Sequence, residues 1–237
     1  MWNYYDYGYK PRKKPKDPAA QLAKLRKKNP DIKPVILEGK KLARTWWGMA
    51  WNKNLESYAD YESRIVRGRS YVRSGAVLDL SVGSGGAHAL VSGSASKPYE
   101  ITVKIEPLPK KKWDALMKKC SHKIASLEDL ASGKFPEELM ELFMDKGGGL
   151  FPSPKEISFS CSCPDWAYMC KHVAAALYGI GARFDDDPML FFTLRDIDFT
   201  ELLKKTVEEK MKSMLKNAGK ATGRVIKDVD THELFGV

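Results

Sequence analysis

Three of the four cysteines and one of the four histidines lie within twelve consecutive residues of the sequence. They are Cys161, Cys163, Cys170 and His172, in the pattern Cys-x-Cys-x6-Cys-x-His. Three thiolates and one imidazole make up the ligand set of a closed tetrahedral zinc site, in which no position is left for water or substrate. The spacing therefore predicts one structural zinc ion held by these four side chains.

Two alternatives for the cluster are weaker. Cysteines can be small buried hydrophobic residues, but four ligand-type side chains at this spacing rarely converge by chance. A disulfide between Cys161 and Cys163 would be strained, and it would leave Cys170 and His172 without a role. The clustering of few cysteines with a histidine favours metal over disulfides.

The elements around the cluster can bring the ligands together. Residues two apart on a strand point to the same side, so a strand over ISFSC directs Cys161 and Cys163 to one point. Cys170 and His172 lie where VAAALYGI begins a helix. The free N–H groups and the dipole at the start of a helix stabilise a thiolate there.

The rest of the chain predicts a mixture of strands and helices. Strands are expected over 64–73, 76–82, 87–94 and 99–107, since apolar and polar residues alternate there and glycine-rich turns separate them. Helices are expected over 42–58, from Pro109, over 126–132 and 136–145, and in three segments after the cluster. Trp46, Trp47 and Trp51 are expected in the core rather than in a base-stacking platform. The fold class is therefore α+β, a small antiparallel sheet with flanking helices.

The cluster, with Trp166 in its loop and an alanine-rich helix after CKH, resembles the SWIM zinc finger. That resemblance implies a strand-strand-helix module with Cys161, Cys163, Cys170 and His172 in its four ligand positions. The blocks RTWWGMAWNKNLESYADY and RGRSYVRSGAVLDL extend the similarity to prokaryotic SWIM zinc finger proteins over most of residues 35–203. The resemblance implies binding to DNA or to proteins, and in bacteria an association with helicase-like ATPases of the chromatin-remodelling type.

Composition divides the chain into three predicted parts. Residues 1–34 form a basic tail expected to stay mostly flexible, residues 35–150 an α+β domain with a four-stranded antiparallel sheet, and residues 151–237 the zinc finger with C-terminal helices. The net charge of +10 divides into +7 over residues 1–34, +7 over 35–122 and −4 over 123–237. Because a basic surface attracts polyanions, nucleic acid is the predicted partner of the N-terminal half, with DNA favoured over RNA.

Alternate residues of the predicted strand over 64–73 would line one face with guanidinium groups and one aromatic ring. Guanidiniums bind phosphates and an aromatic ring stacks on a base, so we prefer this face as the nucleic-acid surface. The alternative is a solvated face with arginine stems packed along the strand. Three lysines at the start of a later helix extend the predicted surface, which comprises Arg64, Arg67, Arg69, Tyr71, Arg73, Lys110, Lys111 and Lys112.

These features predict a protein without enzymatic activity that binds nucleic acid while zinc holds the fold. The sequence contains no phosphate-cradling loop and no nucleophile elbow. It also lacks an apolar run of the roughly 20 residues that span a membrane, and its start lacks the apolar block of a signal peptide. A cytoplasmic location is therefore expected, with association with the nucleoid left open. The alternative function is an adaptor that docks on a helicase-like ATPase through the finger and the helices after it. An exposed apolar patch around Tyr168, Phe184 or Phe191 would support the adaptor, and burial of these residues would count against it.

Overall fold

The structure, a computed structural model, describes residues 15–57, 59–120, 137–145 and 149–198, with single residues between 200 and 216. Its helices are α1 (Pro18–Lys28), α2 (Trp46–Glu56), α3 (Glu62–Arg73), α4 (Lys110–Cys120), α6 (Glu137–Met144), α7 (Lys171–Asp186) and α8 (Met189–Leu194). Its strands are β1 (Val77–Gly83), β2 (Gly86–Val91), β3 (Tyr99–Ile105) and β4 (Ile157–Cys161). The predicted α+β fold class is confirmed.

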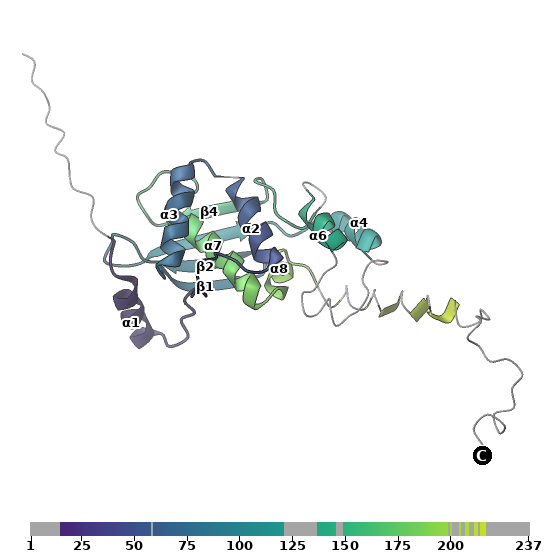
Figure 1. The fold of residues 1–237 in the computed structure, drawn as a ribbon, viewed down its shortest axis with the longest axis horizontal. Coiled ribbons are helices and arrows are strands. Elements are labelled where there is room, and N and C mark those ends of the chain that lie inside the picture. Colours follow the sequence, from purple (N-terminus) through teal and green to yellow (C-terminus); the bar gives the residue numbers. More distant parts are fainter. Residues whose placement is uncertain are drawn as a thin grey trace, which may run out of the picture.

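The strands form one antiparallel sheet in the order β1-β2-β3-β4 (Figure 1). Along β3, Ile101 and Val103 are buried whereas Glu100 and Lys104 are exposed, as expected for a sheet with one covered face. The opposite face is polar where four residues lie in register across all four strands: Ser81, His88, Thr102 and Ser160.

Helix α7 lies at the centre of the core. It contacts α2, α3, α8 and all four strands, and Figure 1 shows α2, α3 and α7 on the same side of the sheet. The buried Trp51 donates a hydrogen bond from Nε1 to the carbonyl oxygen of Leu177 in α7, at 2.9 Å. Trp47 and Trp51 are 1% and 0% exposed, so their predicted place in the core is confirmed.

Residues 64–73 form most of helix α3, so the predicted strand over this segment is wrong. The buried residues Ile65, Gly68 and Val72 recur at intervals of three and four, which is the period of a helix packed on one side. The spacing of the arginines suggested alternation, but the side chains that pack against α7 decided the conformation. The fourth strand is instead β4, which pairs with β3 and ends at Cys161.

The sheet crosses the predicted boundary between residues 150 and 151, because β3 lies before it and β4 after it. Residues before 35 also contact the sheet. The Lys16 N–H donates to the Gly93 carbonyl oxygen just after β2 (2.8 Å), and the Leu80 N–H of β1 donates to the Lys33 carbonyl oxygen (3.0 Å). Parts of residues 16–34 thus contact the sheet, and α1 lies within this segment.

Two further points concern the predicted helix over 126–132 and the membrane-spanning character of the helices. The predicted helix over 126–132 lies outside the described residues. Among the helices that the structure describes, none combines the length and the apolar character needed to cross a membrane.

Candidate metal centre

Strand β4 and helix α7 place the four predicted ligands. Cys161 is the last residue of β4, and Cys163 follows two residues later. Cys170 is the N-cap of α7, where its Sγ accepts the Val173 N–H at 3.5 Å, and His172 lies in the first turn. The pairing of β4 with β3 and the burial of α7 under α2 and α3 therefore fix both halves of the site.

The ligand atoms converge. Cys163 Sγ lies 3.6 Å from Cys170 Sγ, and His172 Nδ1 lies 3.9 Å from Cys161 Sγ and 3.9 Å from Cys170 Sγ. All four ligand atoms lie within 4.8 Å of one another. Zn–S bonds of about 2.3 Å and Zn–N bonds of about 2.0 Å separate the ligand atoms of a tetrahedron by about 3.5 to 3.8 Å. The cluster fits one zinc ion, whereas a sulfur–sulfur distance of 3.6 Å is far longer than a disulfide bond.

The cysteines differ in acidity. The pKa of Cys170 is lowered to about 4, mainly by the hydrogen bond from Cys161 and further by His172 and the Val173 N–H, although burial raises it. The pKa of Cys161 is raised, mainly by its hydrogen bond to Cys170 and then by burial. Zinc takes thiolates as ligands, so metal binding at this cluster releases protons.

Two aromatic rings hold the imidazole of His172. The centroid of the Tyr99 ring lies 4.4 Å from that of the imidazole, and the Tyr71 ring lies at 5.4 Å with its plane inclined by 70°. Nδ1 faces the cysteine sulfurs, while the buried Nε2 has no hydrogen-bond partner among the described residues. A side chain at Gly93 would meet both Tyr99 and His172, so a glycine is required there.

The fold and the site define a protein with a closed zinc finger, since four protein ligands complete a tetrahedral zinc and leave no position for a substrate. A family model of the SWIM zinc finger matches residues 159–179, which contain all four ligands. The chain thus contains a SWIM zinc finger, and Cys161, Cys163, Cys170 and His172 form its site for one zinc ion.

The chain is also similar to the uncharacterized protein Rv2102 of Mycobacterium tuberculosis. The two are 37% identical over 163 residues, which cover 68% of this chain and 58% of the relative. The chain therefore spans less than two thirds of the length of that relative. No solved structure matches the chain.

The predicted nucleic-acid residues of 64–73 do not share one face, because successive residues of a helix turn by about 100°. Arg64, Arg67 and Tyr71 lie on the flank of α3 beside the finger. There, Arg64 forms an ion pair with Asp165 at 3.1 Å, and Tyr71 packs against the ring of His172. The pKa of Tyr71 is raised, chiefly by burial. Of these three predicted residues, Arg67 is the one that is exposed.

Arg69 and Arg73 lie on the other flank of α3. Arg69 forms an ion pair with Glu56 at 2.6 Å and donates from Nε to Tyr178 Oη at 2.9 Å. The exposed Arg73 donates from Nε to the carbonyl oxygen of Lys40 at 3.4 Å. Arg64 therefore links α3 to the loop of the finger, and Arg69 links α3 to α2 and α7. Arg67 and Arg73 are instead exposed to solvent.

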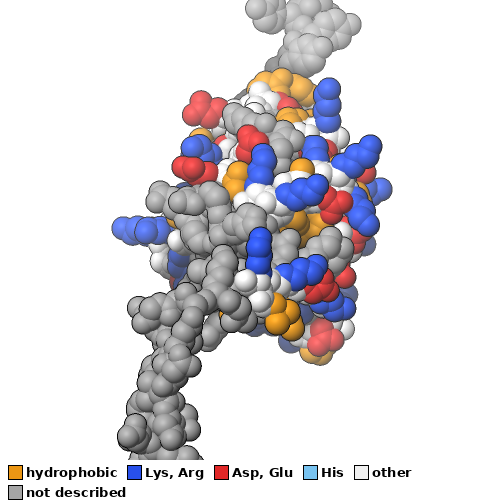
Figure 2. Space-filling view, turned by 90° about the vertical axis from the view of Figure 1, so that its right-hand side faces the viewer, with side chains coloured by type: hydrophobic (Ala, Val, Ile, Leu, Met, Phe, Trp, Pro, Cys, Tyr) orange, Lys and Arg blue, Asp and Glu red, His pale blue; other side chains and the backbone are white. Residues whose placement is uncertain are grey.

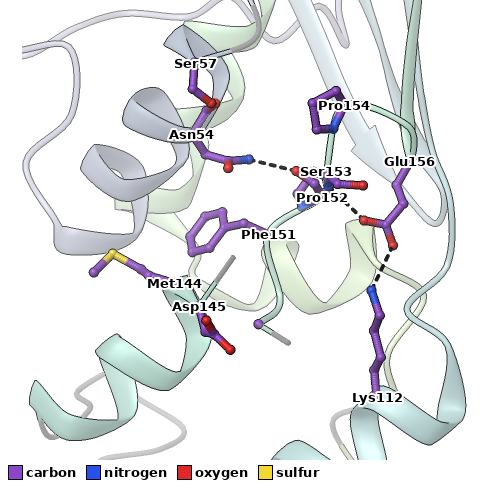
Figure 3. Close-up of a pocket in the computed structure, with 11 residues that line it drawn as sticks. Asn54, Ser57, Lys112, Met144, Asp145, Phe151, Pro152, Ser153, Pro154 and Glu156 are labelled. Atoms are coloured by element: carbon purple, nitrogen blue, oxygen red, sulfur yellow. Dashed lines mark hydrogen bonds and ion pairs between the residues drawn. The ribbon is translucent and has the colours of Figure 1, made fainter. Parts of the chain in front are cut away.

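The three predicted lysines lie away from α3. Helix α4, which begins at Lys110, lies at the opposite end of the folded part from α3 (Figure 1). Lys110 and Lys111 are exposed, whereas Lys112 points to Glu156 with a nitrogen–oxygen distance of 3.8 Å (Figure 3). The lysines therefore do not extend a surface formed by α3.

Sequence reasoning missed Gly93, Tyr99 and the role of Asp165 in holding the finger. Gly93 and Tyr99 lie 79 and 73 residues before His172 in the sequence, so no local spacing connects them to the cluster. The alternation of apolar and polar residues around them predicted two strands. It could not predict that the ring of Tyr99 would lie beside His172.

Proposed function

We propose that the protein binds nucleic acid at the end of the sheet where α3 ends and β1 begins. The observation that carries this proposal is a group of exposed cations there, none of which forms an ion pair with a described acidic residue. We call this group the basic end, and it consists of Lys16, Lys24, Arg26, Lys27, Lys28, Lys40, Lys41, Arg67, Arg73 and Lys97.

Backbone and side-chain contacts hold these cations together at one end. After Arg73 the chain turns at Ser74 and Gly75 into Ala76, whose carbonyl oxygen accepts the Ser92 N–H at 2.7 Å. Gln21 of α1 donates from Nε2 to the carbonyl oxygen of Ser96 at 3.1 Å. Helices α1 and α3 both lie toward the left of Figure 1.

The opposite end of the molecule has a different charge pattern. Figure 2 views the molecule from the side of α4, and Lys and Arg side chains are interspersed there with Asp and Glu side chains. The exposed acidic residues Asp17, Asp31 and Glu38 also lie near the basic end, but its cations outnumber them. An excess of cations favours phosphate binding by counterion release, whereas an evenly mixed surface does so less. This contrast favours the basic end as the site of contact.

In this proposal zinc has a structural role and the protein binds without catalysis. The finger contributes β4 to the sheet and α7 to the core, and α7 is the helix on which α3 packs. Zinc thereby fixes the helix that carries Arg67 and Arg73. DNA is the nucleic acid we expect, and a helicase-like ATPase acting on DNA would be a compatible partner.

Binding to labelled DNA and RNA duplexes at several salt concentrations tests the proposal. We expect the double variant Arg67→Ala and Arg73→Ala to bind more weakly, and its salt dependence to fall by about 0.9 in log K per log salt for each phosphate that the variant no longer neutralises. The double variant Lys110→Ala and Lys111→Ala is the matched control, since it removes the same charge from α4. Binding that is absent at low salt, or that both double variants reduce equally, would contradict the proposal.

The adaptor alternative has weaker support. Phe184 and Phe191 are both 0% exposed, and their burial counts against a docking patch on α7 and α8. Tyr168 is 52% exposed and remains available for contact. A pull-down of an ATPase that depends on Tyr168 but not on Arg67 would favour the adaptor over nucleic-acid binding.

A further inference from the structure

Trp166 is an exposed aromatic residue on a well-held loop. Its side chain is 79% exposed, although it lies between the zinc ligands Cys163 and Cys170. Asp165 Oδ1 accepts the N–H of Ala167 at 3.3 Å, and Ala167 is itself buried. The residues on both sides of Trp166 are thus fixed while the indole extends into solvent.

A second ring, that of Tyr61, lies beside the indole. The two ring centroids are 5.6 Å apart and the planes are inclined by 86°, and Tyr61 is 46% exposed. Because the rings are nearly perpendicular, at least one face of the indole stays uncovered by this contact. The uncovered face is large enough for another flat group to stack on it.

Helix α3 is fixed to this loop and carries positive charge beside it. Arg64 and Asp165 form an ion pair at 3.1 Å with side chains only 24% and 14% exposed. Arg67 follows nearly one turn later on the same flank, and it is exposed without an ion-pair partner among the described residues. An open aromatic face and an exposed guanidinium therefore lie on one rigid surface.

We propose that this surface binds single-stranded nucleic acid, with a base stacked on Trp166 and a neighbouring phosphate at Arg67. We call it the α3 surface and define it as Tyr61, Arg67 and Trp166. The inference rests on the proposed function and narrows its ligand to strands with unpaired bases. Proteins that bind single strands without sequence preference combine these two elements, stacking rings and a cationic path for the backbone.

The charges around Trp166 favour a base over a phosphate at that point. The carboxylates of Asp60 and Glu62 flank Tyr61 in the sequence, and Asp165 precedes Trp166. They repel phosphate but not an uncharged base, so the backbone is directed toward Arg67. In a duplex the base faces are stacked on one another, and the indole can reach such a face only in an unpaired strand.

The test uses the full zinc-loaded chain and labelled oligo(dT), oligo(rU) and a DNA duplex of equal length. We expect Trp166→Ala to weaken binding to both single strands by about 5- to 150-fold, the range measured when one stacking ring is removed. The duplex affinity and the salt dependence should stay unchanged. Trp166→Phe should restore most of the loss, and Met49→Ala, at a residue 51% exposed on α2, should have no effect.

The outcomes separate this inference from the proposed function. If Trp166→Ala leaves single-strand binding unchanged, or weakens duplex binding as much, the inference is wrong while binding that depends on Arg67 and Arg73 still supports the proposed function. If no nucleic acid binds at low salt, both fail. If the α3 surface instead binds a protein, and oligonucleotides do not displace that protein, the proposal that a base stacks on Trp166 is wrong.

Discussion

Glu156 connects three parts of the molecule through one carboxylate. It accepts the Ser153 N–H at 2.8 Å, and its other oxygen lies 3.2 Å from Arg195 Nη2 and 3.8 Å from Lys112 Nζ (Figure 3). Arg195 is 0% exposed. Burial raises the pKa of Glu156, but the bonds from Ser153 and the charge of Arg195 outweigh burial and lower it.

The lowered pKa of Glu156 predicts a pH-dependent contribution to stability. A carboxylate with a lower pKa in the folded state stabilises the fold above its unfolded pKa, and this contribution is lost as the pH falls through the folded value. We expect Glu156→Gln to lower the free energy of unfolding at pH 7 by about 3 kcal/mol, because a buried guanidinium loses its partner. Below about pH 4 the difference from the wild-type protein should shrink.

Urea unfolding at neutral and acid pH measures this effect. Glu100→Gln is the control, since Glu100 is exposed on β3 and forms no ion pair with a described residue. Each comparison uses a pH at which metal analysis shows that zinc is still bound, because loss of zinc would by itself unfold residues next to Glu156. An equal difference between Glu156→Gln and wild type at both pH values would show that the charge of Glu156 does not matter.

At the scale of elements, the contact between α3 and α7 depends on a glycine in a helix. A Cβ at Gly68 would lie 2.5 Å from the Cβ of Ala174, and close to the α7 backbone. The two helices can approach this closely because neither has a larger side chain at the crossing. This contact turns the segment over 64–73 into a packed helix and directs Tyr71 toward His172.

We expect Gly68→Ala to destabilise the protein by about 1 to 3 kcal/mol, because α3 must move away from α7. In a solvent-exposed helix the same change would be stabilising, so the sign distinguishes packing from helix propensity. Gly83→Ala is the control, since a Cβ at Gly83 meets nothing within 4 Å. Thermal unfolding monitored by circular dichroism measures both, and a Gly68→Ala protein as stable as wild type would refute the close contact.

At the scale of the whole molecule, zinc joins the sheet to the helical layer. Cys161 ends β4, Cys163 follows it, and the other two ligands lie at the start of α7, so the ion ties the edge strand to the central helix. Loss of zinc leaves the three cysteine side chains and the imidazole without the cation that they coordinate. The effect should spread from the cluster to α2 and α3 through their contacts with α7.

We expect chelation, or Cys170→Ser, to remove the one zinc ion and to unfold at least residues 157–181. Structural zinc contributes roughly 10 to 16 kcal/mol of apparent binding energy in isolated finger peptides, which exceeds the stability of most domains. The tryptophan emission of the protein, to which the buried Trp47 and Trp51 contribute, should shift to the red as the bond between Trp51 and Leu177 breaks. Metal analysis and tryptophan fluorescence measure this, with Cys120→Ser, outside the cluster, as the control. A metal-free protein with an unchanged melting temperature would show that zinc is not structural.

The sequence alone determined the metal site, because its ligands lie within twelve residues and their spacing suits a strand followed by a helix. It also determined three strands of the sheet, where short-range alternation separates a buried from a solvated face. Only the tertiary structure decided that 64–73 is a helix, since α7 lies a hundred residues away in the sequence. It likewise decided that Arg64 and Arg69 are engaged in ion pairs and that Trp166 is exposed while Phe184 is buried, because burial depends on long-range packing that no local pattern contains.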